Sequence, residues 1–370
     1  MVNKAFKIRM YLNKTQRNQV RQNVGCCRFV YNFFLNERIN HYNAVKEMKS
    51  YQDLAYALPF LKREFPWMCN AESTSLQQTI KDMDLAYKSF FKGNGFPKFK
   101  SKKNNKQSFR MVMGIKIIDN THLKLPKLGI IRVRHGFDLS SINKIYNATI
   151  SLESTGKFFI SISTLSEVKT KPMTGLNVGI DLGLKEFATY SDGTVISRIK
   201  FTQKYEKSLA FRQRKLARMK FNSNNYQKQK IRIAIVHEKI KNQRVDFIHK
   251  ITSSLTDDYD VICIEDLNAS GMIKNNRLAK SIADVSFFEF KRQLEYKTNW
   301  YGKTLSKIDK WFPSSKNCSN CGNKKEDLTL ADRIYQCNKC GLIIDRDLNA
   351  ALNILTAGTA GLAYSILDGS

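Results

Sequence analysis

The chain has 370 residues, with 62 Lys and Arg against 32 Asp and Glu and a formal net charge of +30. Such a surplus on a chain that is 42% hydrophobic indicates a folded protein with a polyanionic partner, and nucleic acid fits better than a membrane surface. No apolar run is long enough to cross a membrane. The length predicts two to three domains.

The first 92 residues predict one strand followed by helices. Residues 4–12 alternate between apolar and polar side chains, which is typical of a half-buried strand. A helix is predicted to begin after Asn13, and a second amphipathic helix covers residues 72–92. We interpret the aromatic stripes of both helices as core. Residues 13–92 are therefore predicted to be a helical module inserted after the first strand.

A basic loop and a β-rich segment follow. Residues 93–103 carry lysines and two phenylalanines, so they can neutralise phosphates and stack on bases, although a solvated loop is the alternative. Residues 109–165 have the pattern of short strands, which predicts a small barrel or sheet that the first strand could join. The candidate nucleic-acid contacts in the loop are Phe96, Lys98, Phe99, Lys100, Lys102 and Lys103.

Two apolar strands are predicted to carry acidic residues after a linker at 166–174. Residues 177–183 form an apolar strand that ends in glycines and contains Asp181. Residues 261–265 are short, β-branched and apolar, so they predict a buried central strand that ends at Glu265. A third acid, Asp347, lies in an acidic run that leads into a helix.

These three carboxylates point to a metal site. An ionised carboxylate in an apolar interior needs a partner, because its desolvation is costly. Hard oxygen ligands select Mg²⁺ or Mn²⁺, and two such ions can stabilise both the attacking and the leaving oxygen of a phosphodiester. Taken singly, Asp181 could form a turn, Glu265 could pair with a lysine and Asp347 could cap a helix. Taken together, they are typical of an RNase H-like nuclease. Asp345 is a neighbour that could be a cap, an ion-pair partner or the ligand itself.

The segment between the first two acids is helical and basic. Residues 201–250 contain 14 Lys and Arg against 3 Asp and Glu, and the polar run at 222–225 predicts a break between two antiparallel helices. One basic face, with Arg214, Lys215 and Arg218, would line a nucleic-acid channel; ordinary solvated helix faces are the alternative. A further helix over 281–300 and a strand over 303–311 are expected.

Four cysteines near the C-terminus form the most specific single motif. Two Cys-x-x-Cys pairs lie fifteen residues apart, each followed by glycine, and they supply four thiolates for tetrahedral Zn²⁺. Because sulfur fills all four positions, we predict a structural zinc ion. The ligands are Cys318, Cys321, Cys337 and Cys340. This ribbon directly precedes Asp347 and could help to position it. The other cysteines lie in apolar contexts, so a reduced intracellular protein is expected. The tail from residue 356 is weakly patterned, and we expect its end to be mobile.

The motifs in this order resemble the TnpB family, also called OrfB: transposon-encoded, RNA-guided nucleases related to the compact type V CRISPR effectors. The similar stretches include residues 28–32, 95–100, 107–110, 179–183, 237–244, 265–268, 311–315 and 345–351, together with both cysteine pairs. Arg110 and Arg244 lie in two of these stretches, and we add them to the expected nucleic-acid contacts.

The resemblance implies an α/β nuclease of the RuvC type with an inserted zinc ribbon, preceded by a β-barrel wedge domain with an inserted helical recognition domain. The expected bounds are 1–12 and 93–170 for the wedge, 13–92 for the recognition domain, 171–312 and 345–370 for the nuclease and 313–344 for the ribbon. A guide RNA from the transposon end would pair with double-stranded target DNA beside a short motif that the protein reads.

The resemblance further implies cleavage of DNA phosphodiesters at Asp181, Glu265 and Asp347 with Mg²⁺, in the cytoplasm of a prokaryote and near its nucleoid, with no protein oligomer required. All three carboxylates are present, so we expect an active enzyme. The alternatives are a guide-directed repressor that does not cut, and a transposase-type nuclease that works without RNA. An actin-like ATPase shares the glycine-rich strand end, but we find no second phosphate loop.

Overall fold

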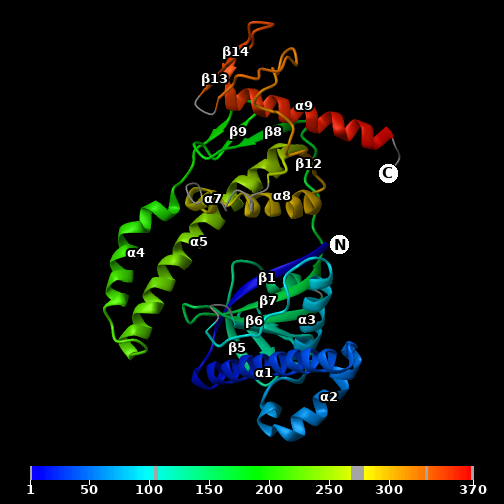
Figure 1. The fold of residues 1–370 in the computed structure, drawn as a ribbon, viewed down its shortest axis with the longest axis vertical. Coiled ribbons are helices and arrows are strands. Elements are labelled where there is room, and N and C mark those ends of the chain that lie inside the picture. Colours follow the sequence, from blue (N-terminus) through cyan, green and yellow to red (C-terminus); the bar gives the residue numbers. More distant parts are fainter. Residues whose placement is uncertain (1, 104–106, 143, 268–278, 330–331, 368–370) are drawn as a thin grey trace. The chain divides into compact units, whose positions relative to one another are not determined.

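The computed structural model describes residues 2–103, 107–142, 144–267, 279–329 and 332–367 (Figure 1). The chain divides into two compact units, Met1–Glu167 and Val168–Ser370. Within the described ranges, no helix combines the length and the apolar character that a membrane crossing requires.

The described residues of the first unit contain three α-helices, each begun by a capping side chain. Asn13 and Ser50 form reciprocal capping boxes with the third residue of their helices, and the Glu72 carboxylate accepts from two backbone N–H groups. The helices are α1 (Lys14–Val45), α2 (Tyr51–Glu64) and α3 (Ser73–Phe91), and a short 3₁₀ turn (Pro66–Asn70) precedes α3. The prediction of helices between residues 13 and 92 is confirmed, although α2 was not predicted individually.

The same unit contains a seven-stranded antiparallel sheet in the order β2-β6-β7-β1-β5-β4-β3. The strands are β1 (Val2–Tyr11), β2 (Gln107–Met111), β3 (Lys116–Asp119), β4 (His122–Leu125), β5 (Gly129–Arg134), β6 (Lys144–Leu152) and β7 (Phe158–Ser166). The first strand does join this sheet, between β7 and β5. The expected barrel is not closed by strand pairing in the described residues, where β2 and β3 form the two edges of the sheet.

The second unit is built on a five-stranded mixed sheet in the order β10-β9-β8-β11-β12. Its strands are β8 (Asn177–Leu182), β9 (Ala188–Tyr190), β10 (Val195–Ile196), β11 (Val261–Glu265) and β12 (Thr304–Ile308). The two central pairings, β8 with β11 and β11 with β12, are parallel. Parallel strands of this kind are buried on both faces, which explains the continuous apolar runs in their sequences.

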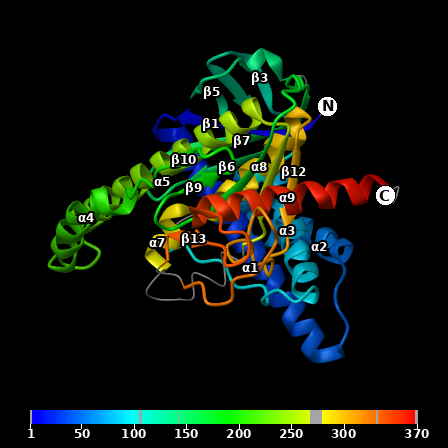
Figure 2. The same ribbon diagram turned by 90° about the horizontal axis from the view of Figure 1, so that it is seen from above.

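Helices cover both faces of this sheet. The side chains of Val178 and Ile264 pack in one core with residues of α5 (Asn224–Asp258) and α8 (Phe287–Tyr301). On the opposite face, Cys263 packs with Ile354 of α9 (Arg346–Leu367). Figures 1 and 2 both show α9 crossing the strands. The weakly patterned tail is therefore helical as far as Leu367, and its last three residues, which we expected to be mobile, lie outside the described residues.

The basic segment forms the predicted antiparallel hairpin. Helix α4 (Phe201–Ala217) packs against α5, and the chain turns at Asn222, whose φ is 65°, before Ser223 caps α5. The helix predicted for 281–300 is instead two helices, α7 (Ala279–Val285) and α8, because Ser286 between them adopts a left-handed conformation.

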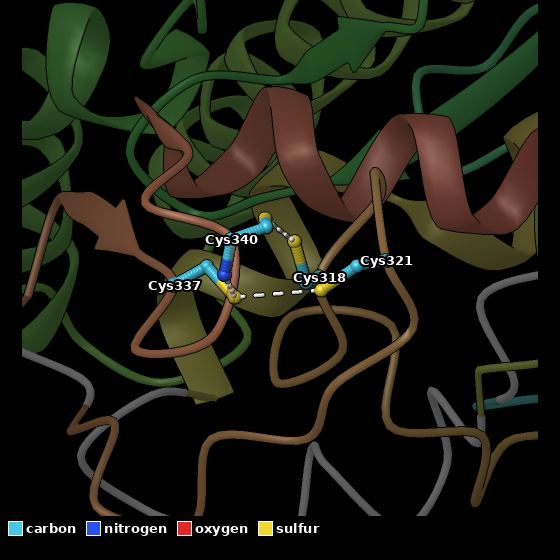
Figure 3. Close-up of side chains that lie close together, drawn as sticks. All are labelled: Cys318, Cys321, Cys337 and Cys340. Carbon is cyan, nitrogen blue, oxygen red and sulfur yellow. Dashed lines mark hydrogen bonds between the residues drawn. The ribbon is translucent and has the colours of Figure 1, made fainter.

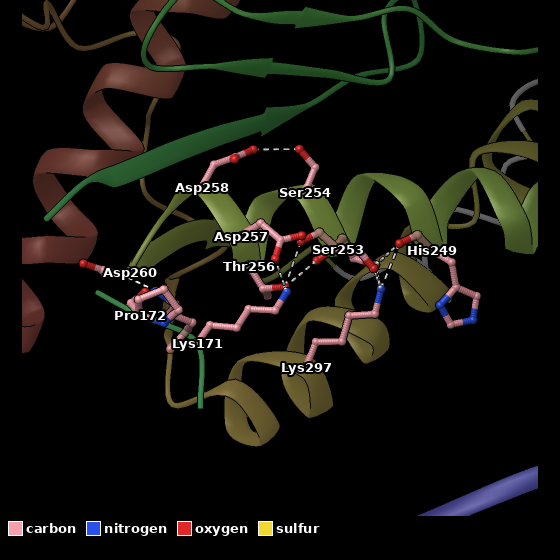
Figure 4. Close-up of polar contacts among 12 residues, drawn as sticks. Lys171, Pro172, His249, Ser253, Ser254, Thr256, Asp257, Asp258, Asp260 and Lys297 are labelled. Carbon is pink, nitrogen blue, oxygen red and sulfur yellow. Dashed lines mark hydrogen bonds and ion pairs between the residues drawn. The ribbon is translucent and has the colours of Figure 1, made fainter. Parts of the chain in front are cut away.

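A buried lysine joins α8 to α5. The Lys297 ammonium donates to the carbonyl oxygen of His249 and to the hydroxyls of Thr252 and Ser253 at 2.7–2.9 Å (Figure 4). These acceptors are uncharged. Burial, reinforced by the nearby Lys171 ammonium, lowers the pKa of Lys297 to about 8.

Candidate active site and four-cysteine cluster

The register of two parallel strands brings the first two carboxylates together. Ile180 of β8 pairs with Ile264 of β11, so Asp181 and Glu265 are the next residues on neighbouring strands. Residues at the same level of a pleated sheet project from the same face, so both side chains lie on one face at the carboxyl ends of the strands.

Helix α9 brings the third carboxylate to the same face. Gly179 lies two residues before Asp181, and a Cβ atom there would collide with the carbonyl oxygen of Ala351 and lie 2.6 Å from the amide nitrogen of Leu355. Glycine thus allows the helix to rest directly on β8. Asp347 lies one helical turn before Ala351, which places it over the end of the strand that carries Asp181.

Asp345 has a different role from its neighbour. Its Oδ1 accepts from the backbone N–H groups of Asp347 and Leu348 at 2.9 and 3.1 Å, so it caps α9. The side chain of Asp347 lies in the first turn, where its Oδ1 accepts from Nε and Nη2 of Arg346 at 3.2 and 3.1 Å. The structure therefore places Asp345 in the cap role, one of those we considered for it.

All three predicted catalytic carboxylates line one cavity of about 620 Å³, which Asp345 does not line. Basic side chains also line this cavity, namely those of Lys185, Lys310, Lys316, Arg333 and Arg346. A centre of carboxylates within a basic wall is the charge distribution that suits cations held beside a phosphate.

Burial raises the pKa values of the two carboxyl groups at the strand ends, Asp181 and Glu265. Burial, followed by repulsion from Glu265 and Asp347, raises the pKa of Asp181 to about 7. Burial also raises the pKa of Glu265, while a hydrogen bond from the Ser314 hydroxyl acts in the opposite direction. A divalent cation would remove the repulsion that raises the pKa of Asp181, so these residues fit a metal.

The four cysteines form a compact cluster in Figure 3. All four sulfur atoms lie within 4.8 Å of one another, and Sγ of Cys318 is 3.5 Å from Sγ of Cys340. The N–H groups of Lys339 and Cys340 donate to Sγ of Cys337, which lowers the pKa of that thiol. These thiols are arranged as ligands of one tetrahedral metal ion.

Two buried asparagines of α9 connect this helix to the segment that carries the first cysteine pair. The Asn349 amide donates to the carbonyl oxygen of Asn317 at 2.7 Å and accepts from the backbone N–H of Ser319 at 2.9 Å. Asn353 donates to the carbonyl oxygen of Ser314 at 2.8 Å. The loop with Ser314, whose hydroxyl donates to Glu265, and with the first cysteine pair is thus fixed to the helix that carries Asp347. Sequence reasoning did not find these residues, although both lie in the acidic-to-helical motif after residue 345.

The predicted contacts of the basic loop are largely exposed. Lys98, Phe99, Lys102 and Lys103 face solvent. Phe96 also packs against the rings of Tyr87 and Phe90 within 5.5 Å. The Lys100 ammonium lies 4.0 Å from the centroid of the Tyr31 ring, and Arg110 forms an ion pair with Asp82.

The predicted contacts of the hairpin differ among themselves. Arg214, Lys215 and Arg218 are exposed and line a hollow of about 590 Å³ on α4 and the residues that follow it. Arg244 instead lies 2.6 Å from the buried carboxylate of Asp284, which also accepts from Thr202. Arg244 thus ties α5 to α7 in this structure.

Comparison with known proteins gives the family. Residues 160–276 match a family model described as "Probable transposase", of the OrfB type of IS605 elements, and residues 287–354 match one described as "Cas12f1-like, TNB domain". Residues 1–47 match a "Helix-turn-helix domain" model, although here they form β1 and the single long helix α1.

Two curated relatives cover nearly the whole chain. "Putative RNA-guided DNA endonuclease" of Streptomyces pristinaespiralis is 34% identical, over 98% of this chain and 91% of that protein. "Putative RNA-guided DNA endonuclease InsQ" of Escherichia coli (strain K12) is 36% identical, over 97% of this chain and 93% of that protein. The chain therefore belongs to the OrfB, or TnpB, family of IS605-type transposons.

The fold agrees with this assignment. The chain is similar to the protein in the cryo-EM structure of a Cas12f1–sgRNA–target DNA complex, with a TM-score of 0.51 at 14% identity over 95% of this chain and 98% of that chain. At this level of identity the similarity concerns the fold alone.

Proposed function

We propose that this protein is an RNA-guided DNA endonuclease that cleaves phosphodiesters at Asp181, Glu265 and Asp347 with two Mg²⁺ ions. The observation that carries the proposal is the convergence of these carboxylates from β8, β11 and α9 into one basic-walled cavity. Carboxylate oxygens are ligands that Mg²⁺ prefers, and a pair of such ions can stabilise both the attacking and the leaving oxygen of a phosphodiester.

The chain's own residues have distinct parts in this chemistry. The ions would supply Lewis-acid stabilisation of the attacking and leaving oxygens. Asp181, Glu265 and Asp347 would hold the ions, and metal binding would favour the charged form of Asp181, whose pKa burial raises to about 7. The Ser314 hydroxyl orients Glu265, and the cap at Asp345 leaves Asp347 pointing into the cavity. Lys185 and Lys310 in the cavity wall would attract the DNA phosphates.

The guide and the domain roles form part of the same proposal. The relatives are named as RNA-guided, and a formal charge of +30 suits a protein that holds RNA and DNA together. We assign residues 1–12 and 93–170 to a wedge domain and 13–92 to a recognition domain. Residues 171–312 and 345–370 form the nuclease domain, and 313–344 form a ribbon closed by one structural Zn²⁺.

The test is to purify the protein from cells that carry its native flanking DNA, to sequence the bound RNA and then to assay cleavage of a matched duplex with Mg²⁺. We expect a discrete RNA from the transposon end and Mg²⁺-dependent cutting. Random cellular RNA with cutting would identify a guide-independent nuclease. A discrete RNA with target binding but no cutting would identify a repressor.

A further inference from the structure

The loop after β12 contains the most exposed large apolar side chain among the described residues. The Trp311 side chain is 80% exposed. Both of its chain neighbours, Lys310 and Phe312, line the carboxylate cavity. Because Ile308 pairs with Glu265, this loop begins at the carboxyl end of the sheet, beside the carboxylates. Trp311 therefore lies between two residues that line the cavity, although its own side chain is not part of the lining.

The backbone of this loop is held in place although the ring is not buried. The Asp309 carboxylate accepts from the N–H of Trp311 at 2.7 Å, and the Asp309 carbonyl accepts from the N–H of Phe312 at 3.1 Å. Phe312 then packs on the core of Cys263, Ile308 and Ile354. Phe312 therefore anchors the loop, and Trp311, the residue before it, is held in an exposed position.

Exposure to water is unfavourable for a tryptophan side chain, because burying its large apolar surface lowers the free energy. The Lys310 ammonium lies 5.2 Å from the centroid of the ring. A lysine and an exposed aromatic ring together suit a nucleotide, because the ammonium attracts the phosphate and the ring stacks on the base.

We propose that Trp311 is a positioning residue that stacks on a base next to the scissile phosphate and thereby holds an unpaired strand in the cavity. Bases within a duplex are already stacked, so the ring accepts a base only where the strand is unwound. This inference rests on the proposed nuclease function and adds a residue and a strand preference to it.

Fluorescence tests the contact directly. The chain has three tryptophans, so the difference between wild type and Trp311→Phe isolates the emission of Trp311. The probes are a thymidine oligonucleotide and an abasic oligonucleotide of the same length, which carries the same charge without bases. We expect the first to quench Trp311 emission and the second to bind without quenching it. Equal quenching by both, or none by either, would overturn the proposal.

Cleavage kinetics test the role. The complex with its co-purified RNA is assayed on a matched duplex and on a matched single strand. Trp311→Ala should lower kcat/KM by roughly tenfold, within the range seen when base–aromatic stacking is removed, mainly by raising KM. Trp311→Phe should restore most of this loss. Because the ring is exposed, the melting temperature should not change.

The outcomes separate the two proposals. If Asp181→Ala abolishes cutting while Trp311→Ala cuts like wild type, the positioning role is wrong and the nuclease function stands. If Asp181→Ala still cuts, the proposed active site is wrong, and the oligonucleotide titration still decides whether the ring stacks on bases. Loss of activity in Trp311→Phe as severe as in Trp311→Ala would indicate a structural role and would also overturn the proposal.

Discussion

The four-cysteine cluster and the carboxylate cavity are two metal-type sites assembled in opposite ways. The cysteines come from two short motifs within 23 residues, and their sulfur atoms lie within 4.8 Å of one another. The acids come from two strands and a helix that are far apart in sequence, and they meet only because β8 pairs with β11 and α9 packs on β8. The first site is therefore specified locally, and the second depends on the whole sheet.

The two sites also differ in whether the surrounding protein favours the charged form of their side chains. Backbone N–H groups stabilise the Cys337 thiolate, whereas burial disfavours the charged form of Asp181. The thiol site is prepared to contribute stability once its metal binds, and the carboxylate site holds charge at a cost to stability. Changes in either site should therefore lower activity, but only changes in the cysteine cluster should also lower stability.

The largest expected effect on activity follows from Asp181→Asn. Removing one ligand charge should lower the cleavage rate by about a thousandfold, because a metal ligand supports several kcal/mol of transition-state stabilisation. The neutral amide also removes a buried charge, so the melting temperature without Mg²⁺ should stay equal or rise. A parallel loss of stability and activity would contradict the contrast between the sites.

The next effect follows from Cys337→Ser. It should release the metal of the cluster, loosen residues 313–344 and lower the cleavage rate on the order of ten- to a hundredfold, as expected for groups that orient a ligand through a second layer of contacts. Hydrogen exchange should show faster exchange in this segment. The matched control is Cys69→Ser, an exposed cysteine outside the cluster, which should leave both properties unchanged. Unchanged exchange in Cys337→Ser would contradict a metal-supported ribbon.

A smaller effect tests how α9 is seated. Gly179→Ala should destabilise the protein by about 1–3 kcal/mol, because the added methyl group meets the backbone of α9 and overpacking costs this much. It should also displace Asp347 and slow cleavage. Gly361→Ala in the same helix is the control, since a Cβ there meets nothing within 4 Å. Equal melting temperatures for the two variants would show that α9 does not rest on β8 as described.

The smallest effect concerns Lys297, a buried residue of α8 that belongs to neither site. The pKa of Lys297 is lowered from 10.5 to about 8, so between these values the unfolded chain binds more protons than the folded one. The free energy of unfolding should therefore rise with pH across this window, by on the order of 1–2 kcal/mol. Lys297→Met should lose this rise, as measured by urea unfolding at pH 8 and pH 10. Identical pH slopes would contradict it.

The sequence predicted which residues come together at the two sites better than it predicted the residues that support them. The cysteine spacing alone predicted the cluster, because local motifs do not depend on distant packing. The acids were found through their strand-end positions and the family resemblance. Ser314, Asn349 and Asn353 were missed, because a hydrogen bond between distant segments leaves no periodic signal.

The fold shows the same limits. The alternation of apolar and polar residues and the short apolar runs predicted strands of both sheets. The polar run at 222–225 predicted the turn of the helical hairpin. Ser286 divides one predicted helix into two, because a single left-handed residue is invisible to helical periodicity. Arg244 was expected to contact nucleic acid, but in the structure it pairs with Asp284, a partner forty residues away that no charge count could identify. Its contact with nucleic acid stays a prediction.

The most direct test compares Asp347→Asn with Asp345→Asn in one cleavage assay on the purified complex with its bound RNA. Asparagine caps helices as well as aspartate does, so Asp345→Asn keeps the start of α9 intact. Asp347→Asn removes a charge from the cavity in the same helical turn. The account predicts near wild-type cutting by the first variant and loss of cutting by the second. Normal cutting by Asp347→Asn, or loss only in Asp345→Asn, would contradict the claim that Asp347 completes the active site.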